Sequence, residues 1–535
     1  MDWPDPIFIF LGFILTVLSI MKIGSFWNSS IREDFPPGPR PLPIIGNLHI
    51  IDLKRPYRTL LKLSETYGPI FSIQMGFTKM VVLSDYETVK EALVNQADAF
   101  AERPKVPVFE DFSNGYGITF SHGENWKVMR RFTLTTLRDF GMGKRAIEDQ
   151  IVEECEHLIK SLESQKGKPF EPTITMNAAV ANIIISILLG ERFDYEDPRF
   201  IRLLHLIHEN ARLLGLPSVQ IYNLFPALGF LLKGHKTVLR NRDELHAFIK
   251  VVFIERFKKL DKNDQRSFID AFLVRQQELI MWQINPLCTH ASADCMEPEV
   301  QPDSPTAWRG KGREAWREKS DTNVYFHNDN LKSLVSNLFA AGMETTYTTL
   351  RWGILLMMKY PEIQQKVQDE IMTVLGSNPP RIKHRTKMPY TDAVVHEIQR
   401  TANILPLSAP HMTTVDVTLK GYFIAKGTYI IPFLGSVLKD KSQWEKPDTF
   451  YPEHFLDSEG KFVKKEAFLP FSAGRRICAG ETLAKMELFL FFTSLLQRFT
   501  FQPALGLSTS DLDLTPAAGL RRAPMPHEIC AVPRA

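Results

Sequence analysis

Apolar residues in this chain recur mostly at the spacing of helices, and short strand-like stretches are confined to a few places. Helical periodicity is clearest in the second half and predicts helices over residues 331–359, 361–375, 392–402 and 480–498. Short runs of β-branched and aromatic residues beside glycine-containing turns predict strands over 70–74, 80–83, 417–419, 422–424 and 429–431. The pattern therefore predicts a mainly α fold with small β-sheets, in one large domain over residues 48–535.

The N-terminus carries a different pattern, a nearly continuous apolar stretch. Residues 7–21 are almost wholly apolar, and residues 23–27 continue the stretch past Lys22. Together they are close to the length that one bilayer crossing needs, so residues 1–27 are predicted to be a transmembrane anchor. Positive charge follows the stretch, at Lys22 and Arg32, which predicts a single pass with the rest of the chain in the cytosol. The alternative is a buried core helix.

A proline-rich segment separates this stretch from the main body. Pro36, Pro37, Pro39, Pro41 and Pro43 lie within residues 28–47, and such a run forms a stiff spacer that cannot continue a helix. We expect a linker with a proline-rich hinge that holds the domain at a fixed angle to its anchor. A ligand for a proline-recognition module is the alternative interpretation.

Residues 279–323 have neither helical nor strand periodicity. They contain Cys288, Cys295 and three of the eight tryptophans, among scattered charges, proline and glycine. A structureless loop this long is uncommon inside a compact domain, so we predict an exposed, disordered insertion, or retained non-coding sequence. A metal site is a minor alternative, since only His290 lies near the two cysteines.

Charge and cysteine content exclude several classes of protein. The 64 Lys and Arg residues nearly balance the 61 Asp and Glu residues, which leaves a formal charge of +3 and no electrostatic reason to expect nucleic acid as a partner. The five cysteines are few and widely spread, and no CxxC or HExxH sequence occurs. A zinc module or a disulfide scaffold is therefore not expected.

The most specific chemical signal is the sequence from Phe471 to Gly480, FSAGRRICAG, which fits F-x-x-G-x-R-x-C-x-G. Gly474 would let the backbone approach a flat ligand, and Arg476 could pair with a carboxylate. Cys478 directly precedes a predicted helix, whose free N–H groups favour a thiolate, and thiolate sulfur is a strong axial ligand for haem iron. The alternative is an inert buried cysteine.

A second signal, AAGMETT over residues 340–346, interrupts the apolar helix predicted over 331–359. The small residues Ala341 and Gly342 would leave room for a ligand against the helix backbone. Glu344 followed by Thr345 could relay protons during oxygen activation if held in a dry setting. A solvated Glu-Thr-Thr face is the alternative.

These motifs resemble those of the cytochrome P-450 haem-thiolate monooxygenases, and the resemblance extends over nearly the whole chain. The anchor and proline spacer are similar to those of the microsomal vertebrate family two, and PHMT (410–413) and GYFI (421–424) are most like its fish K-type subfamily. The resemblance implies the P-450 fold, with a single large haem domain behind an N-terminal transmembrane anchor.

The resemblance also implies the roles of individual residues. Cys478 would be the fifth ligand of the iron in haem b, within a haem-binding segment that includes Phe471, Gly474 and Gly480. Glu344 and Thr345 would take part in oxygen activation, and Glu397 with Arg400 would form a structural E-x-x-R pair joined by residues 452–455. The haem propionates would be bound by Arg103, Trp126, Arg130, His411 and Arg476.

The implied activity is an NADPH- and O2-dependent unspecific monooxygenase of the endoplasmic reticulum membrane. Its partners would be membrane lipid, NADPH-cytochrome P-450 reductase, with cytochrome b5 as a further donor, and a lipophilic fatty acid or xenobiotic. Lys127, Arg131 and Arg475 would offer a basic surface to a redox partner. The alternatives are a reductase-independent haem-thiolate isomerase or dehydratase, and a non-functional or haem-deficient variant disrupted by residues 279–323.

Overall fold

The computed structural model describes residues 12, 16, 34–284 and 323–534. The predicted anchor over residues 1–27 lies almost wholly outside this part of the chain, as does most of the predicted insertion. Within the described ranges, no helix combines the length and the apolar character that a bilayer crossing requires.

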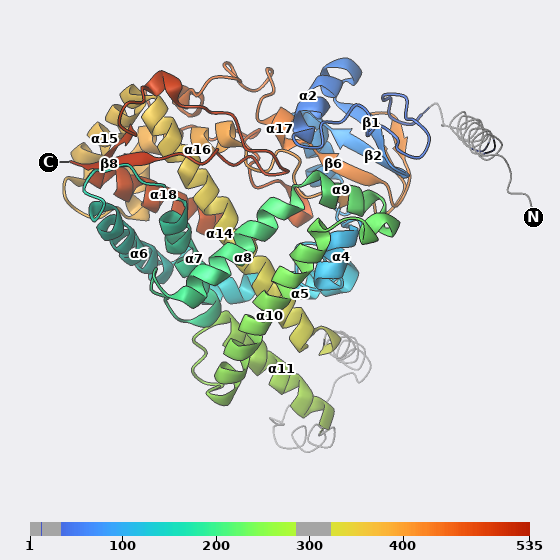
Figure 1. Cartoon of the computed structure of the whole chain (residues 1–535), viewed down its shortest axis with the longest axis horizontal. Helices are drawn as coiled ribbons and strands as arrows, with labels where there is room; N and C mark the ends of the chain where they lie inside the picture. Colours follow the sequence, from blue (N-terminus) through green and yellow to red (C-terminus); the bar gives the residue numbers. More distant parts are fainter. Residues whose placement is uncertain (1–11, 13–15, 17–33, 285–322, 535) are drawn as a thin grey trace, which may run out of the picture.

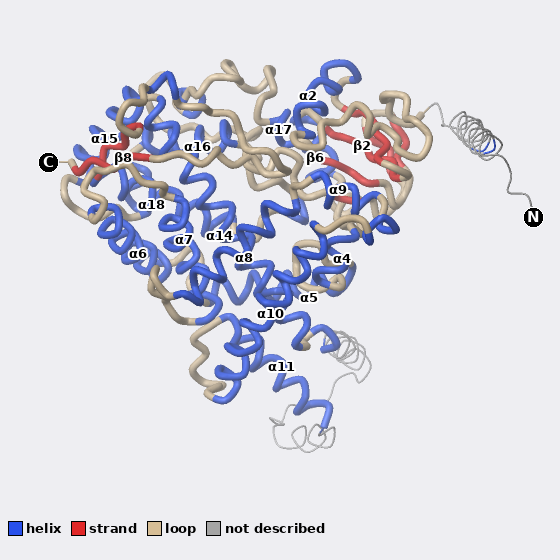
Figure 2. Tube along the Cα trace, in the orientation of Figure 1, coloured by secondary structure: helices blue, strands red, loops and turns tan. Residues whose placement is uncertain are grey.

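Helices make up most of the body (Figure 2). In chain order they are α2 (Pro56–Tyr67), α3 (Tyr86–Lys90), α4 (Pro107–Ser113), α5 (Gly123–Asp139), α6 (Arg145–Glu163), α7 (Thr173–Leu189), α8 (Pro198–Leu214), α9 (Pro217–Leu224), α10 (Gly234–Lys258), α11 (Phe268–Ile284), α14 (Asn328–Lys359), α15 (Pro361–Leu375), α16 (Pro389–Ala402), α17 (Leu434–Val437) and α18 (Glu481–Arg498). The four predicted helices correspond to α14, α15, α16 and α18, with ends that differ by three residues at most. The mainly helical fold is therefore confirmed.

The strands form small sheets at two ends of the body (Figure 2). They are β1 (Ile70–Met75), β2 (Thr78–Leu83), β3 (His411–Met412), β4 (Val417–Leu419), β5 (Tyr422–Ile424), β6 (Tyr429–Pro432), β7 (Phe499–Pro503) and β8 (Ile529–Pro533). The largest sheet has the order β1-β2-β6-β3, in which β2 and β6 are parallel and the other pairs antiparallel. The pairs β4–β5 and β7–β8 stand apart from it.

One boundary of the predicted insertion is wrong. Helix α11 continues to Ile284, so residues 279–284 are helical rather than part of an irregular segment. The boundaries of an element are the least reliable part of a prediction from sequence periodicity. The remainder of that segment, 285–322, lies outside the described residues.

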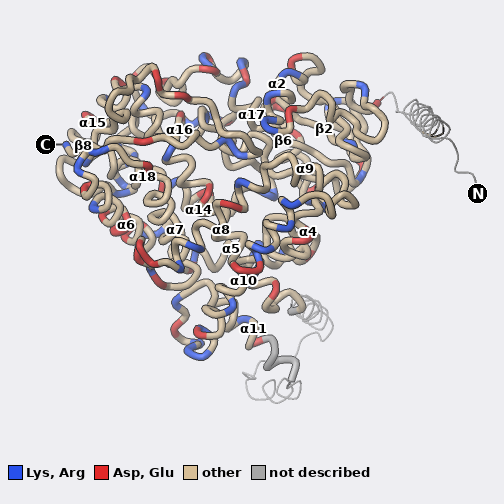
Figure 3. The backbone as a smooth tube through the Cα atoms, viewed as in Figure 1, with Lys and Arg blue, Asp and Glu red and all other residues tan. Residues whose placement is uncertain are grey.

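Helix α14 crosses the middle of the body and provides its main axis (Figure 1). It packs against α7, α18 and α16, and most of its side chains are buried. Helix α7 is apolar on nearly all sides because it is enclosed by α6, α14 and α11. Acidic and basic residues are interspersed over the elements around this core (Figure 3), in line with the small net charge.

Candidate active site

Cys478 lies at the end of a tight turn that leads into α18. Ser472 and Gly474 both adopt positive φ angles, 63° and 74°, and the Cys478 N–H donates to the carbonyl oxygen of Phe471 at 3.1 Å. Helix α18 begins at Glu481, with Gly480 as its N-cap. The turn therefore presents the thiol beside a helix N-terminus, as the sequence predicts.

The charge state of Cys478 depends on opposing effects. The Cys478 side chain is exposed, but desolvation by the surrounding protein is the largest effect and raises the pKa of the thiol. The backbone N–H groups of Gly480 and Glu481 and the charge of Arg130 lower it. The helix contribution thus has the expected sign, but desolvation exceeds it. A bound metal cation would supply the missing stabilisation, because coordination deprotonates a thiol outright.

Gly474 is required by a contact within the protein. A Cβ atom at this position would lie 1.8 Å from the carbonyl oxygen of Leu93, which belongs to a π-helical turn, Glu91–Asn95. With a φ of 74° in addition, only glycine fits here. Within the protein, the close approach that requires this glycine is therefore to the backbone of Leu93.

Arg476 extends from the same turn into a buried cluster of cations. Its guanidinium donates to the carbonyl oxygens of Ala101 at 2.7 Å and Ser121 at 3.0 Å, and its centre lies 3.7 Å from the ring centroid of Trp126. Trp126 and Arg130 lie one turn apart on α5, as the sequence predicts, and Arg130 donates to the carbonyl oxygen of Ile477 at 2.6 Å. The turn before Cys478 is thus held by α5.

Arg103 and His411 complete this cluster from two other segments. Arg103 donates to the carbonyl oxygens of Ala409 and Pro410 at 2.8 and 2.7 Å, which places it beside His411 at the start of β3. The Nδ1 atom of His411 lies 2.7 Å from the carbonyl oxygen of Phe100. Burial, followed by the charge of Arg103, keeps the pKa of His411 well below its ordinary value.

The positive charges of this cluster outnumber the negative charges next to them. Burial and the charge of Arg103 lower the pKa of Arg476 to about 8, and burial and Arg130 lower that of Arg103 to about 10. Glu102 lies 3.4 Å from Arg476; burial raises its pKa, but hydrogen bonds and this charge outweigh that effect and hold it at about 2. One carboxylate faces several guanidinium groups, so the site favours a further anion.

Three buried polar atoms of this cluster, two of them donors, are left without a partner among the described residues. Within the described part of the chain, the Nε1 atom of Trp126, the Nε2 atom of His411 and the Nη1 atom of Arg476 have no hydrogen-bond partner. Buried polar groups are rarely left unpaired, and these three belong to one cluster next to Cys478. The Nδ1–H group of the neutral His411 ring donates to the Phe100 carbonyl oxygen, so its Nε2 atom is an acceptor. The propionates of a haem would accept hydrogen bonds from the Trp126 and Arg476 donors, so the residues present fit that cofactor.

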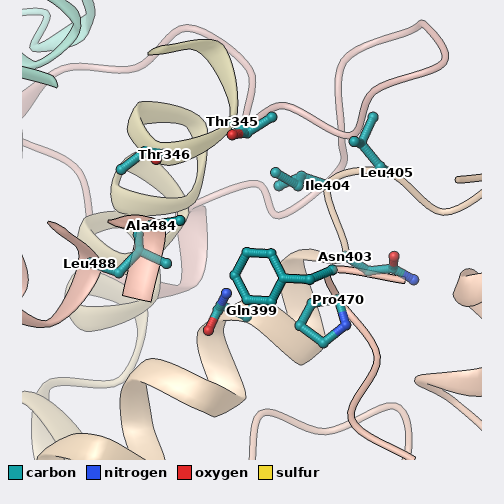
Figure 4. Close-up of a pocket in the computed structure, with 10 residues that line it drawn as sticks. Thr345, Thr346, Gln399, Asn403, Ile404, Leu405, Pro470, Ala484 and Leu488 are labelled. Atoms are coloured by element: carbon teal, nitrogen blue, oxygen red, sulfur yellow. The ribbon is translucent and has the colours of Figure 1, made fainter. Parts of the chain in front are cut away.

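Thr345 and Phe471 line one cavity, where two of the predicted motifs meet (Figure 4). The cavity has a volume of about 40 Å³ and is bounded by α14, α16, α18 and the segments around residues 404 and 470. Its lining residues are Thr345, Thr346, Gln399, Asn403, Ile404, Leu405, Pro470, Phe471, Ala484 and Leu488. The hydroxyl of Thr345 donates to the carbonyl oxygen of Ala341 at 2.8 Å.

Glu344 leaves α14 in another direction, away from the Thr345 hydroxyl. Its side chain is buried and forms an ion pair with Arg521, in the segment between β7 and β8 (residues 504–528, the C-terminal loop). His208 of α8 and Tyr347 also approach the carboxylate, at 3.3 and 3.4 Å. The structure therefore brings Thr345 to the cavity and Glu344 to a separate buried network, although the two residues are adjacent in sequence.

The predicted room for a ligand beside Gly342 is absent. A Cβ atom on Gly342 would lie 2.6 Å from the Cδ1 atom of Ile184 on α7. This small residue therefore permits close packing of α14 on α7, so the expectation is wrong for Gly342, whereas Ala341 is exposed. A residue pattern along one helix cannot show which neighbour covers it.

The pair Glu397 and Arg400 is fully buried on α16. Two parallel hydrogen bonds of 2.7 Å join the side chains, and Arg400 also donates to the carbonyl oxygens of Leu438, Pro447 and Thr449. His454, in the 3-10 turn Pro452–Phe455, lies 3.3 Å from Glu397. The pair thus joins α16 to the segment that precedes the Cys478 turn.

The predicted basic surface is largely paired with acidic residues. Arg475 makes a two-bond contact with Asp98, and Lys127 lies 2.9 Å from Glu124. All four side chains are exposed, so these pairs are weak and open to exchange with a partner.

Several residues of the site carry no recognisable sequence signal. Arg521 and His208 reach Glu344 from positions 177 and 136 residues away, and Glu487 of α18 accepts a hydrogen bond from Thr346 at 3.1 Å. Because each contact joins distant segments, only the fold brings these residues together.

Comparison with known proteins agrees with the geometry. The sequence model of the family described as Cytochrome P450 matches residues 36–285 and 311–531, and the match is interrupted at 286–310, within the predicted insertion. The chain is 48% identical to Cytochrome P450 2K4 of Oncorhynchus mykiss over 526 residues, which cover 98% of this chain and 97% of that protein.

Other relatives are similar over most of their length. Cytochrome P450 2K6 of Danio rerio is 48% identical over a match that covers 92% of this chain and 90% of that protein. Cytochrome P450 2C5 of Oryctolagus cuniculus is 42% identical over a match that covers 99% of this chain and 100% of that protein. The predicted resemblance to family two and its fish K-type members is confirmed. The chain therefore belongs to the cytochrome P450 family, whose members are haem-thiolate monooxygenases that bind haem b.

Proposed function

We propose that this protein is an NADPH- and O2-dependent monooxygenase that inserts one oxygen atom into a lipophilic substrate, a fatty acid or a xenobiotic. Electrons would come from a separate flavoprotein reductase. The observation that carries this proposal is the position of Cys478 beside a buried cationic cluster, in which the Trp126 Nε1 and Arg476 Nη1 donors have no partner among the described residues. That combination of a thiol ligand and an anion site suits haem.

Each residue of the cluster has a task in holding the cofactor. Cys478 would ligate the iron, and Arg103, Trp126, Arg130, His411 and Arg476 would bind the propionates. When bound, haem supplies the binding of O2 and its reduction with electrons from NADPH. Phe471, Gly474 and Gly480 keep the ligand turn in its conformation, and Glu397 with Arg400 anchors the segment that precedes it.

Glu344 and Thr345 would hold and donate the protons that oxygen activation consumes. The Thr345 hydroxyl lies at the cavity that the Phe471 segment also lines, so it can donate a hydrogen bond there when it leaves the Ala341 carbonyl. Glu344 is a buried carboxyl on the preceding residue, able to hold a proton at Oε1 or Oε2. Thr345→Ala should therefore uncouple NADPH oxidation from product formation.

The sequence supports a location on the endoplasmic reticulum membrane. The apolar stretch over residues 7–21, followed by Lys22 and Arg32, is typical of a single-pass anchor with a cytosolic domain. NADPH-cytochrome P-450 reductase would deliver electrons there, with cytochrome b5 as a second donor. The exposed pairs of Arg475 and Lys127 could exchange their acidic partners for those of a reductase.

The first test is the absorption spectrum of the full-length protein, reduced with dithionite and exposed to carbon monoxide. A strongly red-shifted Soret band that disappears in Cys478→His is expected. Addition of reductase and NADPH should then yield oxygenated product from dodecanoic acid or 7-ethoxycoumarin. Turnover of a peroxide substrate without NADPH would instead identify a haem-thiolate isomerase or dehydratase.

The interrupted family match supports a second candidate, a haem-deficient variant. Residues 286–310 have no counterpart in the family model and could hinder haem incorporation. Deleting residues 286–310 tests this, because the deletion would restore the Soret band only if the segment is disruptive. Equal haem content in both proteins would exclude this candidate.

A further inference from the structure

Glu344 lies at the centre of a buried polar junction between three parts of the chain. Arg521, from the C-terminal loop, pairs with its carboxylate and also donates to the Thr348 hydroxyl at 3.2 Å. His208, from α8, places Nδ1 at 3.3 Å from Glu344 Oε1 and at 2.9 Å from the Tyr347 hydroxyl. The junction thus joins α14 to α8 and to the C-terminal loop.

The members of the junction differ greatly in exposure. The side chains of Glu344 and Arg521 are 6% and 15% exposed, whereas that of His208 is 40% exposed. His208 is therefore the member that connects the buried carboxylate to water. An imidazole suits this position because it can accept a proton at one ring nitrogen and release one from the other.

Burial and the charged groups around His208 lower its pKa, so the ring is neutral at neutral pH. Burial is the main cause of its lowered pKa, and the guanidinium groups of Arg521, Arg351 and Arg212 act in the same direction. Glu171 opposes them weakly. These groups come from the C-terminal loop, α14, α8 itself and the segment before α7. A neutral ring is free to take up a proton and pass it on.

We infer that His208 passes protons from water to Glu344, and that Arg521 positions the carboxylate to receive them. This inference rests on the proposed role of Glu344 in oxygen activation. A solvated proton binds at one ring nitrogen of His208, and the proton on Nδ1 moves to Glu344 Oε1, with no change in electron count. Because both residues act through Glu344, they are positioning residues.

The ion pair with Arg521 explains how a proton that reaches Glu344 can be passed on toward Thr345. Protonation removes the negative charge of Glu344, and with it the attraction that holds the side chain against Arg521. The neutral carboxyl can then rotate about its side-chain bonds toward the Thr345 side of α14. Deprotonation restores the charge and the contact with Arg521, so the cycle resets.

The test compares His208→Gln with His205→Gln in the haem-loaded full chain. His205 is exposed on the same helix, so it provides a matched control. The probe is the compound that the wild-type protein oxidises in the assay above, and product formed per NADPH is measured from pH 6 to pH 9 in H2O and D2O. We expect the product yield of His208→Gln to fall about tenfold, with an increased solvent isotope effect. Imidazole added to the His208→Ala variant should restore the product yield.

A second measurement does not depend on activity. Arg521→Gln and Glu344→Gln should each lower the melting temperature, and the double variant should lower it by less than the sum, because the two side chains form one pair. Arg521→Lys should retain most of the product yield. Additive melting shifts would overturn the positioning role of Arg521.

The outcomes separate this inference from the proposed function. Loss of coupling in Glu344→Gln and Thr345→Ala, but not in His208→Gln, would overturn the inference and leave the function in place. Normal coupling in all three variants would overturn the proton role of Glu344, and this inference with it.

Discussion

Glu487 is a fully buried carboxyl group with few hydrogen bonds to offset its loss of contact with water. It lies on α18, its Oε2 atom accepts a hydrogen bond from Thr346 at 3.1 Å, and its Oε1 atom has no partner among the described residues. Burial raises its pKa from 4.5 to about 8. The native protein therefore holds a proton here at neutral pH that the unfolded chain has released.

This difference makes the stability of the protein depend on pH. Between about pH 4.5 and pH 8 the native state binds one proton more than the unfolded state at this site, so the free energy of unfolding falls as pH rises. The slope is about 1.4 kcal/mol per pH unit. Glu487→Gln removes this titration while it keeps the shape of the neutral acid. Relative to wild type, the variant should gain about 3 kcal/mol between pH 5 and pH 7.5.

Thermal melting of the two haem-loaded proteins over this pH range measures the effect. For a chain of this length, about 3 kcal/mol corresponds to about 3 °C in the difference between the two melting temperatures. Other titrating groups are common to both proteins and cancel. Glu65→Gln, on the surface of α2, controls for the loss of a carboxylate. A constant difference between Glu487→Gln and wild type across the range would refute the reasoning, since it would mean that Glu487 is ionised in the native state.

Three further predictions concern the haem site and its support. Gly474→Ala should abolish the carbon monoxide spectrum, because the new Cβ would clash with the Leu93 carbonyl; an unchanged spectrum would contradict this. Arg400→Leu should lower the free energy of unfolding by about 3–5 kcal/mol in denaturant titrations, since it leaves the buried Glu397 carboxylate without its guanidinium partner; a loss below about 1 kcal/mol would contradict this. Trp126→Phe keeps a ring under Arg476 but removes the unpaired Nε1 donor, so transfer of haem to apomyoglobin should be about tenfold faster than from wild type; an equal rate would speak against a propionate contact.

Local features of the site could be read from the sequence because their causes are local. Helix α15 begins at Pro361 and ends at Leu375 as predicted, since a proline at the first turn and an amphipathic repeat both act over a few residues. Helical spacing alone was enough to predict the pair of Glu397 and Arg400. The start of a helix was enough to predict the position of Cys478 before α18. The strand pair β7–β8 was missed because its partners are separated by a long irregular segment.

Predictions about what surrounds a residue were less successful. Gly342 was expected to face a ligand and instead packs against Ile184, and Gly474 meets the carbonyl of Leu93. In both cases the glycine was recognised, but the neighbour comes from a segment more than 150 residues away. Sequence shows that space is needed, and only the packed structure shows what fills it.

The sequence by itself determined the class of the protein: a mainly helical body, a cysteine placed at a helix start and an acid followed by a hydroxyl on a long apolar helix. These are short-range properties of the chain. The tertiary structure decided which groups share an environment. It assembles the cluster in which Trp126 and Arg476 each have a donor without a partner among the described residues, and it brings Arg521 and His208 to Glu344. Charge interactions and desolvation act through space, so the ionisation and the partners of these groups depend on the fold rather than on neighbours along the chain.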